Sequence, residues 1–362
     1  MEPGTTAIVQ DPPVASKDAA MRDAMSDALS TSTSITDAEK RTVWERLVPY
    51  ISIARPDHWF KNVFMLLGAL LAGFYHPEVL SPSVVPRLLA ALFVTCILAS
   101  SNYVINEILD APTDLSHRTK RFRPIPSGLV RLPIAYVEWI VLAIVGLALA
   151  YCINPPFALC GAALLFMGLA YNVPPVRLKE WPYLDVLSES INNPLRLMLG
   201  WYVVSPGDVP PLSLLIFYWM IGAFFMASKR FAEYRAIADK TSAGNYRKSF
   251  RYYNEESLLV SMFFYATTAA LFLGVFIVRF KLELMLSIPL VAGAFAFYLH
   301  VALKPESAAQ APERLYRERG LTLYLAASMV VFIALMFTHV PALYRWFNVE
   351  PAHLPELWKI ER

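Results

Sequence analysis

The chain has 362 residues, of which 56% are hydrophobic and 17% charged, and its formal net charge is +3. Such a composition excludes an ordinary water-soluble domain, and the small positive charge does not predict a nucleic-acid partner. We therefore predict an all-α, polytopic membrane protein.

Residues 1–45 are rich in Ala, Ser, Thr and Asp and contain no apolar block long enough for a signal-peptide core. We predict a disordered cytoplasmic tail there. The motif RPDHWFKN at residues 55–62 then leads into the first apolar run, residues 63–74. Arg55 and Lys61 in this motif either anchor the helix at the lipid headgroups or face acidic residues further along the chain, and the sequence leaves both readings open.

Eight further apolar runs have about the length that a bilayer requires. They cover residues 85–108, 134–153, 157–171, 184–204, 212–227, 258–278, 284–303 and 321–340. We thus expect nine spans in a catalytic domain of residues 46–345, followed by a short tail of residues 346–362. Lys and Arg concentrate in the loops after runs two, four, six and eight, so the positive-inside rule places these loops and the N-terminus in the cytoplasm. The C-terminus is expected outside the inner (plasma) membrane.

An acidic motif, N-E-x-x-D-x-x-x-D, ends the second run with Asn106, Glu107, Asp110 and Asp114. Three of these residues recur every four positions and share one helix face, while Glu107 lies at its edge. Carboxylates that gather near hydrocarbon repel one another unless a cation neutralises them. Oxygen ligands without His or Cys favour Mg2+, which we predict these four residues to bind.

Basic residues follow the acidic motif directly, among them Arg118, Lys120 and Arg121. Their side chains could hold the phosphate oxygens that a metal leaves free. The alternative is that this basic run only marks the cytoplasmic border of the span. Together, the acidic and basic clusters predict a phosphorylated substrate.

The fifth run carries a polar stripe, because Asp185, Glu189, Asn192, Asn193 and Arg196 recur at intervals of about three or four residues. Such a stripe must face the interior of the helix bundle or water. We expect a second metal or phosphate site there, and the alternative is a hydrogen-bond network that only holds helices together.

Several motifs resemble the UbiA superfamily of intramembrane prenyltransferases. They are RPDHWFKN, the first acidic motif, RPIPSG at residues 123–128, YNVPPVRLK at residues 171–179, and D-x-x-x-E beginning at Asp185. The resemblance covers residues from about 50 to 340 and implies nine transmembrane helices around a central cavity, with two acidic motifs that bind Mg2+ and a diphosphate. The chain departs from the family in having Asn106-Glu107 where Asn-Asp is usual, and Asn-Asn-Pro at residues 192–194.

Three other segments resemble the branch of this family that makes decaprenyl-phosphate phosphoribose: SKRFAEYRAI at 228–237, YRKSFRYYNEESL at 246–258 and PERLYRERG at 312–320. This resemblance implies transfer of a 5-phosphoribosyl group from phosphoribosyl pyrophosphate to a polyprenyl phosphate, with release of pyrophosphate. The lipid phosphate is already ionised near neutral pH, so no general base is required.

Roles for individual residues follow from that resemblance. The residues expected to be catalytic are Asp110, Asp114, Lys61, Lys120 and Arg121. The residues expected to contact substrate are Arg55, Asn106, Arg118, Asp185, Glu189, Arg196, Lys229 and Arg230, of which Lys229 and Arg230 would serve the ribose 5-phosphate or the lipid phosphate.

Two other functions stay open at this point. One is a prenyltransferase of the same superfamily that moves a prenyl group from a prenyl diphosphate to an aromatic or lipid acceptor. The other is a transporter or structural membrane protein, which would need no Mg2+ and would tolerate Asp110→Asn. The sequence also leaves open the isoprenoid length and whether the chain forms a homo-oligomer.

Overall fold

The computed structural model describes residues 42–79, 81–115, 119–237, 242–305, 307–310, 315, 317–350 and 357–360. The chain divides into two units, residues 1–52 and 53–362. The predicted N-terminal tail lies almost wholly outside the described residues. In the first unit the described chain forms most of helix α2 (Val43–Ile53), which begins at a capping box between Thr42 and Glu45.

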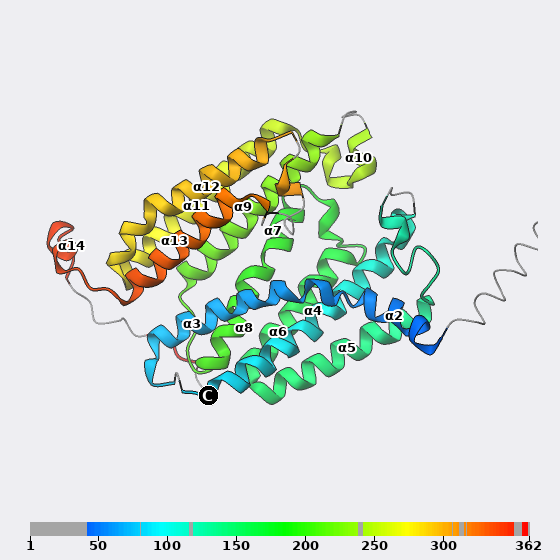
Figure 1. The fold of residues 1–362 in the computed structure, drawn as a ribbon, viewed down its shortest axis with the longest axis horizontal. Coiled ribbons are helices and arrows are strands. Elements are labelled where there is room, and N and C mark those ends of the chain that lie inside the picture. The colour runs from blue at the N-terminus through cyan, green and yellow to red at the C-terminus, as the bar shows by residue number, and fades with distance from the viewer. Residues whose placement is uncertain are drawn as a thin grey trace, which may run out of the picture. The chain divides into compact units, whose positions relative to one another are not determined.

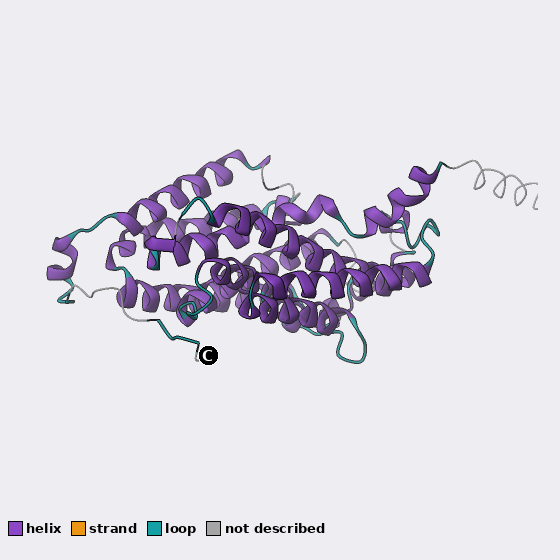
Figure 2. Cartoon of the chain, turned by 90° about the horizontal axis from the view of Figure 1, so that it is seen from below, coloured by secondary structure: helices purple, strands orange, loops and turns teal. Residues whose placement is uncertain are grey.

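The described part of the second unit consists of helices joined by loops, as Figure 2 shows. Its longer helices are α3 (Met65–Tyr75), α4 (Val84–Asp114), α5 (Leu132–Ile153), α6 (Pro155–Asn172), α7 (Leu184–Ser190), α8 (Asn192–Val204), α9 (Leu212–Ala236), α11 (Glu255–Phe280), α12 (Ile288–Leu303) and α13 (Arg319–Phe337). Its 3-10 helices and shortest α-helices are η1 (Pro56–Phe64), η2 (Pro77–Val79), η3 (Lys120–Phe122), η4 (Leu178–Glu180), α10 (Ala243–Tyr246), η6 (Lys248–Arg251), η7 (Leu282–Ser287), η8 (Ala308–Gln310) and α14 (Pro341–Trp346).

Seven helices in the described part are long and apolar enough to cross a membrane. The prediction of an all-α, polytopic membrane protein is therefore confirmed, whereas the count of nine spans is not. The first expected run begins in η1, so that only the 11 residues of α3 remain as a helix. The fifth run is divided at Ile191 into α7 and α8, neither of which has the length of a full span.

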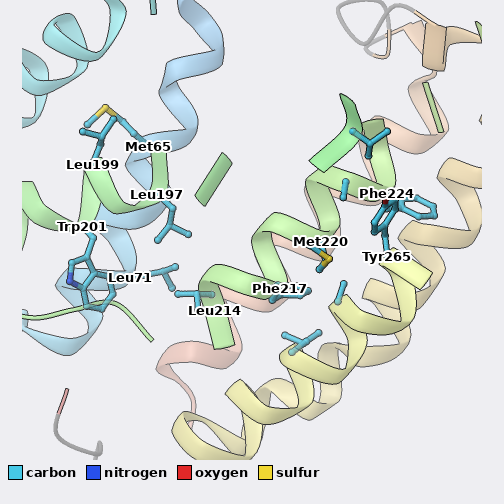
Figure 3. Packing of buried hydrophobic residues seen from close by; sticks show 14 of the residues in the cluster. Met65, Leu71, Leu197, Leu199, Trp201, Leu214, Phe217, Met220, Phe224 and Tyr265 are labelled. Atoms are coloured by element: carbon cyan, nitrogen blue, oxygen red, sulfur yellow. The ribbon is translucent and has the colours of Figure 1, made fainter. Parts of the chain in front are cut away.

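The helices of the second unit form two groups, with α7 between them (Figure 1). In one group α4 packs on α5 and α6, and α3 packs on α8; in the other α9 packs on α11 and α12. Figure 3 shows how buried side chains such as Trp201 and Leu71 fill the first group, while Phe217 and Tyr265 lie between α9 and α11. The buried apolar residues of both groups belong to one continuous core, and α7 packs between the two groups.

Helices α3 and α8 approach each other closely enough for their backbones to touch. A Cβ atom at Gly200 would lie 1.7 Å from the carbonyl oxygen of Met65, and one at Gly68 would lie 1.9 Å from that of Leu197. Only glycine fits at such a crossing, as in other small-residue contacts between membrane helices. The crossing brings the start of α8, with Arg196, beside η1.

The C-terminal part of the chain also contacts this unit. The amide of Val209 donates to the carbonyl oxygen of Trp358 at 2.8 Å, and the amide of Ile360 donates to that of Gly207 at 2.8 Å. Residues 357–360 are thus paired with the loop between α8 and α9.

Candidate functional site

The first acidic motif lies on the last turns of α4, and a lysine from a distant loop lies against it. The ammonium group of Lys179 donates directly to Oδ1 of Asp110. It also donates to Oδ1 of Asn106 at 3.3 Å and to Oδ1 of Asn172 at 2.9 Å. Three side-chain oxygens from α4 and α6 therefore surround one positive charge.

Arg177 joins Lys179 in this cluster. Its Nη2 donates to Oδ1 of Asp110 at 3.3 Å, and its Nε lies 2.7 Å from Glu180. Arg177 has a φ of 32°, in the left-handed region that non-glycine residues seldom adopt, and it immediately precedes η4. Burial lowers the pKa of the Lys179 ammonium, and the nearby Asp110 carboxylate opposes that shift. Neither basic residue was among the predicted site residues.

Asp114 has its own basic partners from the loop that follows α4. Nη1 of Arg123 donates to Oδ2 of Asp114 at 2.7 Å, and Nζ of Lys120 lies 3.8 Å from Oδ1. Burial lowers the pKa of Lys120, an effect that Asp114 opposes. The structure thus places the predicted pair Asp114 and Lys120 together and adds Arg123, from the RPIPSG motif, to them.

Glu107 makes a different contact from the rest of its motif. Its side chain is buried, and its Oε1 accepts a hydrogen bond from the backbone N–H of Ile125 at 3.2 Å. This bond holds the RPIPSG loop against α4. A role for Glu107 as a fourth metal ligand therefore stays a prediction. In the structure, the side chain of Glu107 holds the loop in place through this hydrogen bond.

The first motif suits a hard cation by the chemistry of its donors. Asn106, Asp110 and Asp114 each have a side-chain oxygen that can bind a hard cation. The ammonium group of Lys179 already lies next to the oxygens of Asn106 and Asp110. Within the described ranges, no group of three or more Asp, Glu, His or Cys side chains is arranged so that it could hold a metal ion. A metal ion at this motif would therefore replace the ammonium group of Lys179, which would then be available to an anion.

The second acidic motif has a guanidinium group at its centre. Arg230 of α9 donates from Nε to Asp185 at 3.0 Å, from Nη2 to Glu189 at 2.8 Å and from Nη1 to Glu233 at 3.3 Å. The Arg230 side chain is 1% exposed. One arginine therefore bonds three carboxylates, two from α7 and one from its own helix.

Asp185 is fully buried in this arrangement. Besides Arg230, it accepts hydrogen bonds from the hydroxyl groups of Ser249 at 3.2 Å and Tyr253 at 2.8 Å. Glu189 remains 34% exposed and also accepts from the hydroxyl group of Tyr171 at 3.0 Å. Asp185 and Arg230 bind each other inside the protein, so their predicted substrate contacts stay untested, and Glu189 is the accessible member of the stripe.

Arg196 lies further along the same stripe and has only neutral partners. Its Nε donates to Oδ1 of Asn62 at 3.0 Å, and its Nη1 donates to the carbonyl oxygen of Asn192 at 3.5 Å. The amide of Asn62 in turn donates to Sγ of Cys96 at 3.3 Å. No carboxylate of the described chain lies within ion-pair distance of Arg196, so this cation keeps its capacity for an anion.

Comparison with known proteins places this arrangement in a family. The model of the UbiA prenyltransferase family matches residues 62–326. The chain belongs to the UbiA prenyltransferase family. The two acidic clusters, the RPIPSG loop and η4 all lie within the matched range.

Named relatives within this family include decaprenyl-phosphate phosphoribosyltransferases. The protein of Mycolicibacterium smegmatis is 32% identical over 209 residues, or 58% of this chain and 63% of that protein. The protein of Mycobacterium tuberculosis is 32% identical over 228 residues, or 62% of this chain and 72% of that protein. The chain thus spans less than two thirds of the M. smegmatis relative. A protoheme IX farnesyltransferase of Flavobacterium psychrophilum is 30% identical over 167 residues, or 45% of this chain and 53% of that protein.

Solved UbiA-family structures share the fold. A UbiA homologue from Archaeoglobus fulgidus, bound to GPP and Mg2+, has a TM-score of 0.59 and 20% identity and covers 82% of this chain and 99% of its own. A digeranylgeranylglyceryl phosphate synthase has a TM-score of 0.56 and 16% identity and covers 81% of this chain and 99% of its own. At these identities the likeness shows the architecture alone.

Two of the remaining predicted residues, Arg55 and Lys61, belong to the RPDHWFKN motif of this UbiA-family chain. The guanidinium of Arg55 lies 5.9 Å from the ring centre of Tyr103 on α4 and 3.7 Å from Asp57, so it faces α4. The ammonium of Lys61 lies 5.9 Å from the ring centre of Phe60. The geometry favours the reading in which Arg55 faces α4, whereas the role of Lys61 stays a prediction.

The other predicted basic residues are Arg121 and Arg118, from the loop after α4, and Lys229 of α9. Arg121 is exposed, and its guanidinium lies 4.7 Å from the ring centre of Phe122. Arg118 lies outside the described residues. Lys229 lies 4.0 Å from Glu233, one turn along α9, and so belongs to the edge of the second cluster.

Lys179 and Arg177 are the clearest residues that the sequence analysis missed. They stand in the YNVPPVRLK motif, which the family resemblance used, but their positive charge was assigned only to membrane orientation. The available signal was a basic pair directly after a proline-containing turn and directly before the span that carries the polar stripe.

Proposed function

We propose that this protein is a transferase that moves a 5-phosphoribosyl group from phosphoribosyl pyrophosphate to a polyprenyl phosphate, with Mg2+ and with release of pyrophosphate. The observation that carries the proposal is the first acidic motif, in which Asp110 and Asp114 are each paired with basic side chains from loops. Such a cluster can bind a metal diphosphate by exchanging internal ion pairs for contacts with the ligand. The similarity to the two mycobacterial relatives supports the choice of substrates.

Asn106, Asp110 and Asp114 would hold Mg2+, which supplies positive charge to the pyrophosphate as it leaves. Lys179 and Arg177, displaced from Asp110, would donate to the phosphate oxygens. These contacts strengthen while the bond from C1 of the ribose to oxygen breaks, because negative charge then grows on the leaving group. Their effect is greatest on the transition state, which is what lowers the barrier.

The second substrate needs a cation of its own. Arg196 has neutral partners, and Lys229 is only loosely paired with Glu233, so these two residues are suited to the lipid phosphate and the ribose 5-phosphate. Because the acceptor phosphate is ionised near neutral pH, the reaction requires no general base. This agrees with the use of lysine and arginine side chains throughout the site.

The membrane placement belongs to the same proposal. We place the chain in the inner (plasma) membrane, with the N-terminus and the loops that carry Lys120, Lys179 and Arg247 in the cytoplasm and the C-terminus outside. A cytoplasmic site would meet a water-soluble sugar phosphate on that side and a lipid phosphate from the bilayer.

Prenyl transfer is the second candidate. The similarity to a protoheme IX farnesyltransferase favours it. Both reactions release a pyrophosphate, so the first motif would serve either one.

The experiment measures radiolabel transfer from phosphoribosyl pyrophosphate to polyprenyl phosphate in membranes that contain the chain, with Mg2+ or EDTA. Asp110→Asn is compared with Glu78→Gln, which removes an exposed carboxylate in η2, close to the opposite end of α4. Label in the lipid that requires Mg2+ and Asp110 but not Glu78 supports the proposal. Transfer of a prenyl group from a prenyl diphosphate, with no ribosyl label, would favour the second candidate.

A further inference from the structure

The second acidic motif is closed around a side chain of the protein itself. Nε, Nη1 and Nη2 of Arg230 each bond a different carboxylate, those of Asp185, Glu233 and Glu189. A planar guanidinium with five donors suits this task, and a small spherical ion would require the carboxylates to converge on one point. We call Arg230 and these three carboxylates the arginine hub.

The hub leaves little capacity for a metal ion. Both oxygens of Asp185 are occupied, Oδ2 by Arg230 and Ser249 and Oδ1 by Tyr253, and the side chain is fully buried. A divalent cation at this position would have to expel Arg230, which is 1% exposed, from among the packed helices. The displaced guanidinium would then lie unpaired in a membrane-spanning bundle, which is a costly state.

Charge also argues against a metal in the hub. Its three carboxylates are matched by the guanidinium of Arg230, by Arg247, whose Nε lies 3.9 Å from Glu233, and by Lys229, whose Nζ lies 4.0 Å from Glu233. Three negative and three positive groups balance while Arg230 stays in place. A divalent ion in place of Arg230 would leave an excess of one positive charge beside the displaced guanidinium. The hub needs no further cation.

The first motif differs in the exposure of Asp110 and in the origin of its basic partners. Asp110 is 19% exposed, and its partners Lys179 and Arg177 reach it from the loop around η4 rather than from the core of a long helix. Lys120, near Asp114, is itself 40% exposed. Because these cations stand in loops, they can move toward a bound phosphate while a metal ion takes their place beside Asp110 and Asp114.

We infer that the second acidic motif is a metal-free hub in which Arg230 takes the place of a divalent cation, so that the chain has a single divalent-cation site, at the first motif. This departs from the two metal-binding motifs that the family resemblance implies. The inference rests on the proposed function only in taking Asn106, Asp110 and Asp114 as the metal ligands. Arg230 is then a positioning residue that joins α7, α9 and the segment from Arg247 to Tyr253.

The test counts Mn2+ ions bound to the purified full chain in lipid nanodiscs, by electron paramagnetic resonance of free Mn2+ during a titration with the metal alone. We expect one ion per chain. Asp110→Asn should weaken its binding at least tenfold, whereas Glu189→Gln should change it less than twofold. Glu189 is chosen because it is partly exposed, so its variant is better suited to folding than a variant of the fully buried Asp185.

A count of zero or two ions in the unchanged chain would overturn the inference, as would loss of an ion in Glu189→Gln. The count uses neither sugar phosphate nor lipid. A failure of phosphoribosyl transfer would therefore leave a count of one intact, and a count of two would leave the transfer reaction intact.

Discussion

The ammonium group of Lys179 donates to the carboxylate of Asp110, although 69 residues separate the two in the chain. This pair joins the loop around η4 to the end of α4 and holds the first acidic motif in a charge-balanced state. A metal diphosphate would separate the pair and give each member a new partner of opposite charge.

Lys179→Met should therefore lower kcat/KM for the sugar donor by about 10²-fold, the size of effect seen when one donor to a developing charge is removed. Lys179→Arg should recover part of the loss, because it keeps the charge. The measurement is the initial rate of label transfer over a range of donor concentrations. Lys248→Met is the matched control, since Lys248 is 61% exposed and pairs with Glu180 of the same loop. Equal rates for Lys179→Met and the control would show that Lys179 does not contact the donor.

Glu107→Gln should leave the Mg2+ requirement almost unchanged. Glu107 accepts the backbone N–H of Ile125, and a glutamine oxygen can accept the same bond. We expect the Mg2+ concentration for half-maximal activity to shift less than about twofold, against tenfold or more for Asp110→Asn. Titration of activity with Mg2+ in both variants provides the comparison. A large shift in Glu107→Gln would restore Glu107 as a metal ligand.

Arg230→Met should destabilise the protein strongly, because it leaves buried carboxylates without their central cation. Breaking a buried ion pair by removing one partner costs about 3–5 kcal/mol. Arg235→Met on the same helix should cost less than about 1 kcal/mol, since the Arg235 side chain is 39% exposed and lies 3.6 Å from an exposed Glu255. Thermal unfolding of both variants in detergent separates the two cases. Similar unfolding temperatures would mean that the hub contributes little to stability.

Local patterns in the sequence were sufficient for some of these features. The spacing of Asn106 and Asp110 places them on one face of a helix, and the structure shows Lys179 bonded to both. The apolar runs predicted the membrane-spanning architecture, and the polar stripe at residues 185–196 predicted a face turned toward the bundle interior or toward water.

Other features depend on contacts between distant residues, which spacing cannot reveal. Arg230 meets Asp185 across 45 residues, so the nature of the cation at the second motif was not visible in either segment alone. Glu107 carries the same charge as its neighbours, but its position at the edge of the helix face turns it toward the loop at Ile125. The division of the fifth run at Ile191 could not be predicted either, because the sequence has no strong helix breaker before Pro194.

The contact between α3 and α8 leads to a last prediction. At Gly200 a methyl group would lie 1.7 Å from the carbonyl oxygen of Met65, a backbone atom that cannot turn aside. Gly200→Ala should therefore force the two helices apart and cost about 1–3 kcal/mol, as overpacked sites do. It should also lower activity, because the same crossing places Arg196 against Asn62.

Gly274→Ala provides the control for that change. Apart from the neighbouring backbone of α11 itself, no atom of the described chain lies within 4 Å of a Cβ at Gly274. Alanine there should leave stability unchanged or raise it by up to about 1 kcal/mol through its higher helix propensity. Thermal unfolding and label transfer should be measured on both variants. If Gly200→Ala unfolds at the same temperature as the control, then α3 and α8 do not pack as closely as the structure shows. The claim that this crossing positions Arg196 would then be wrong.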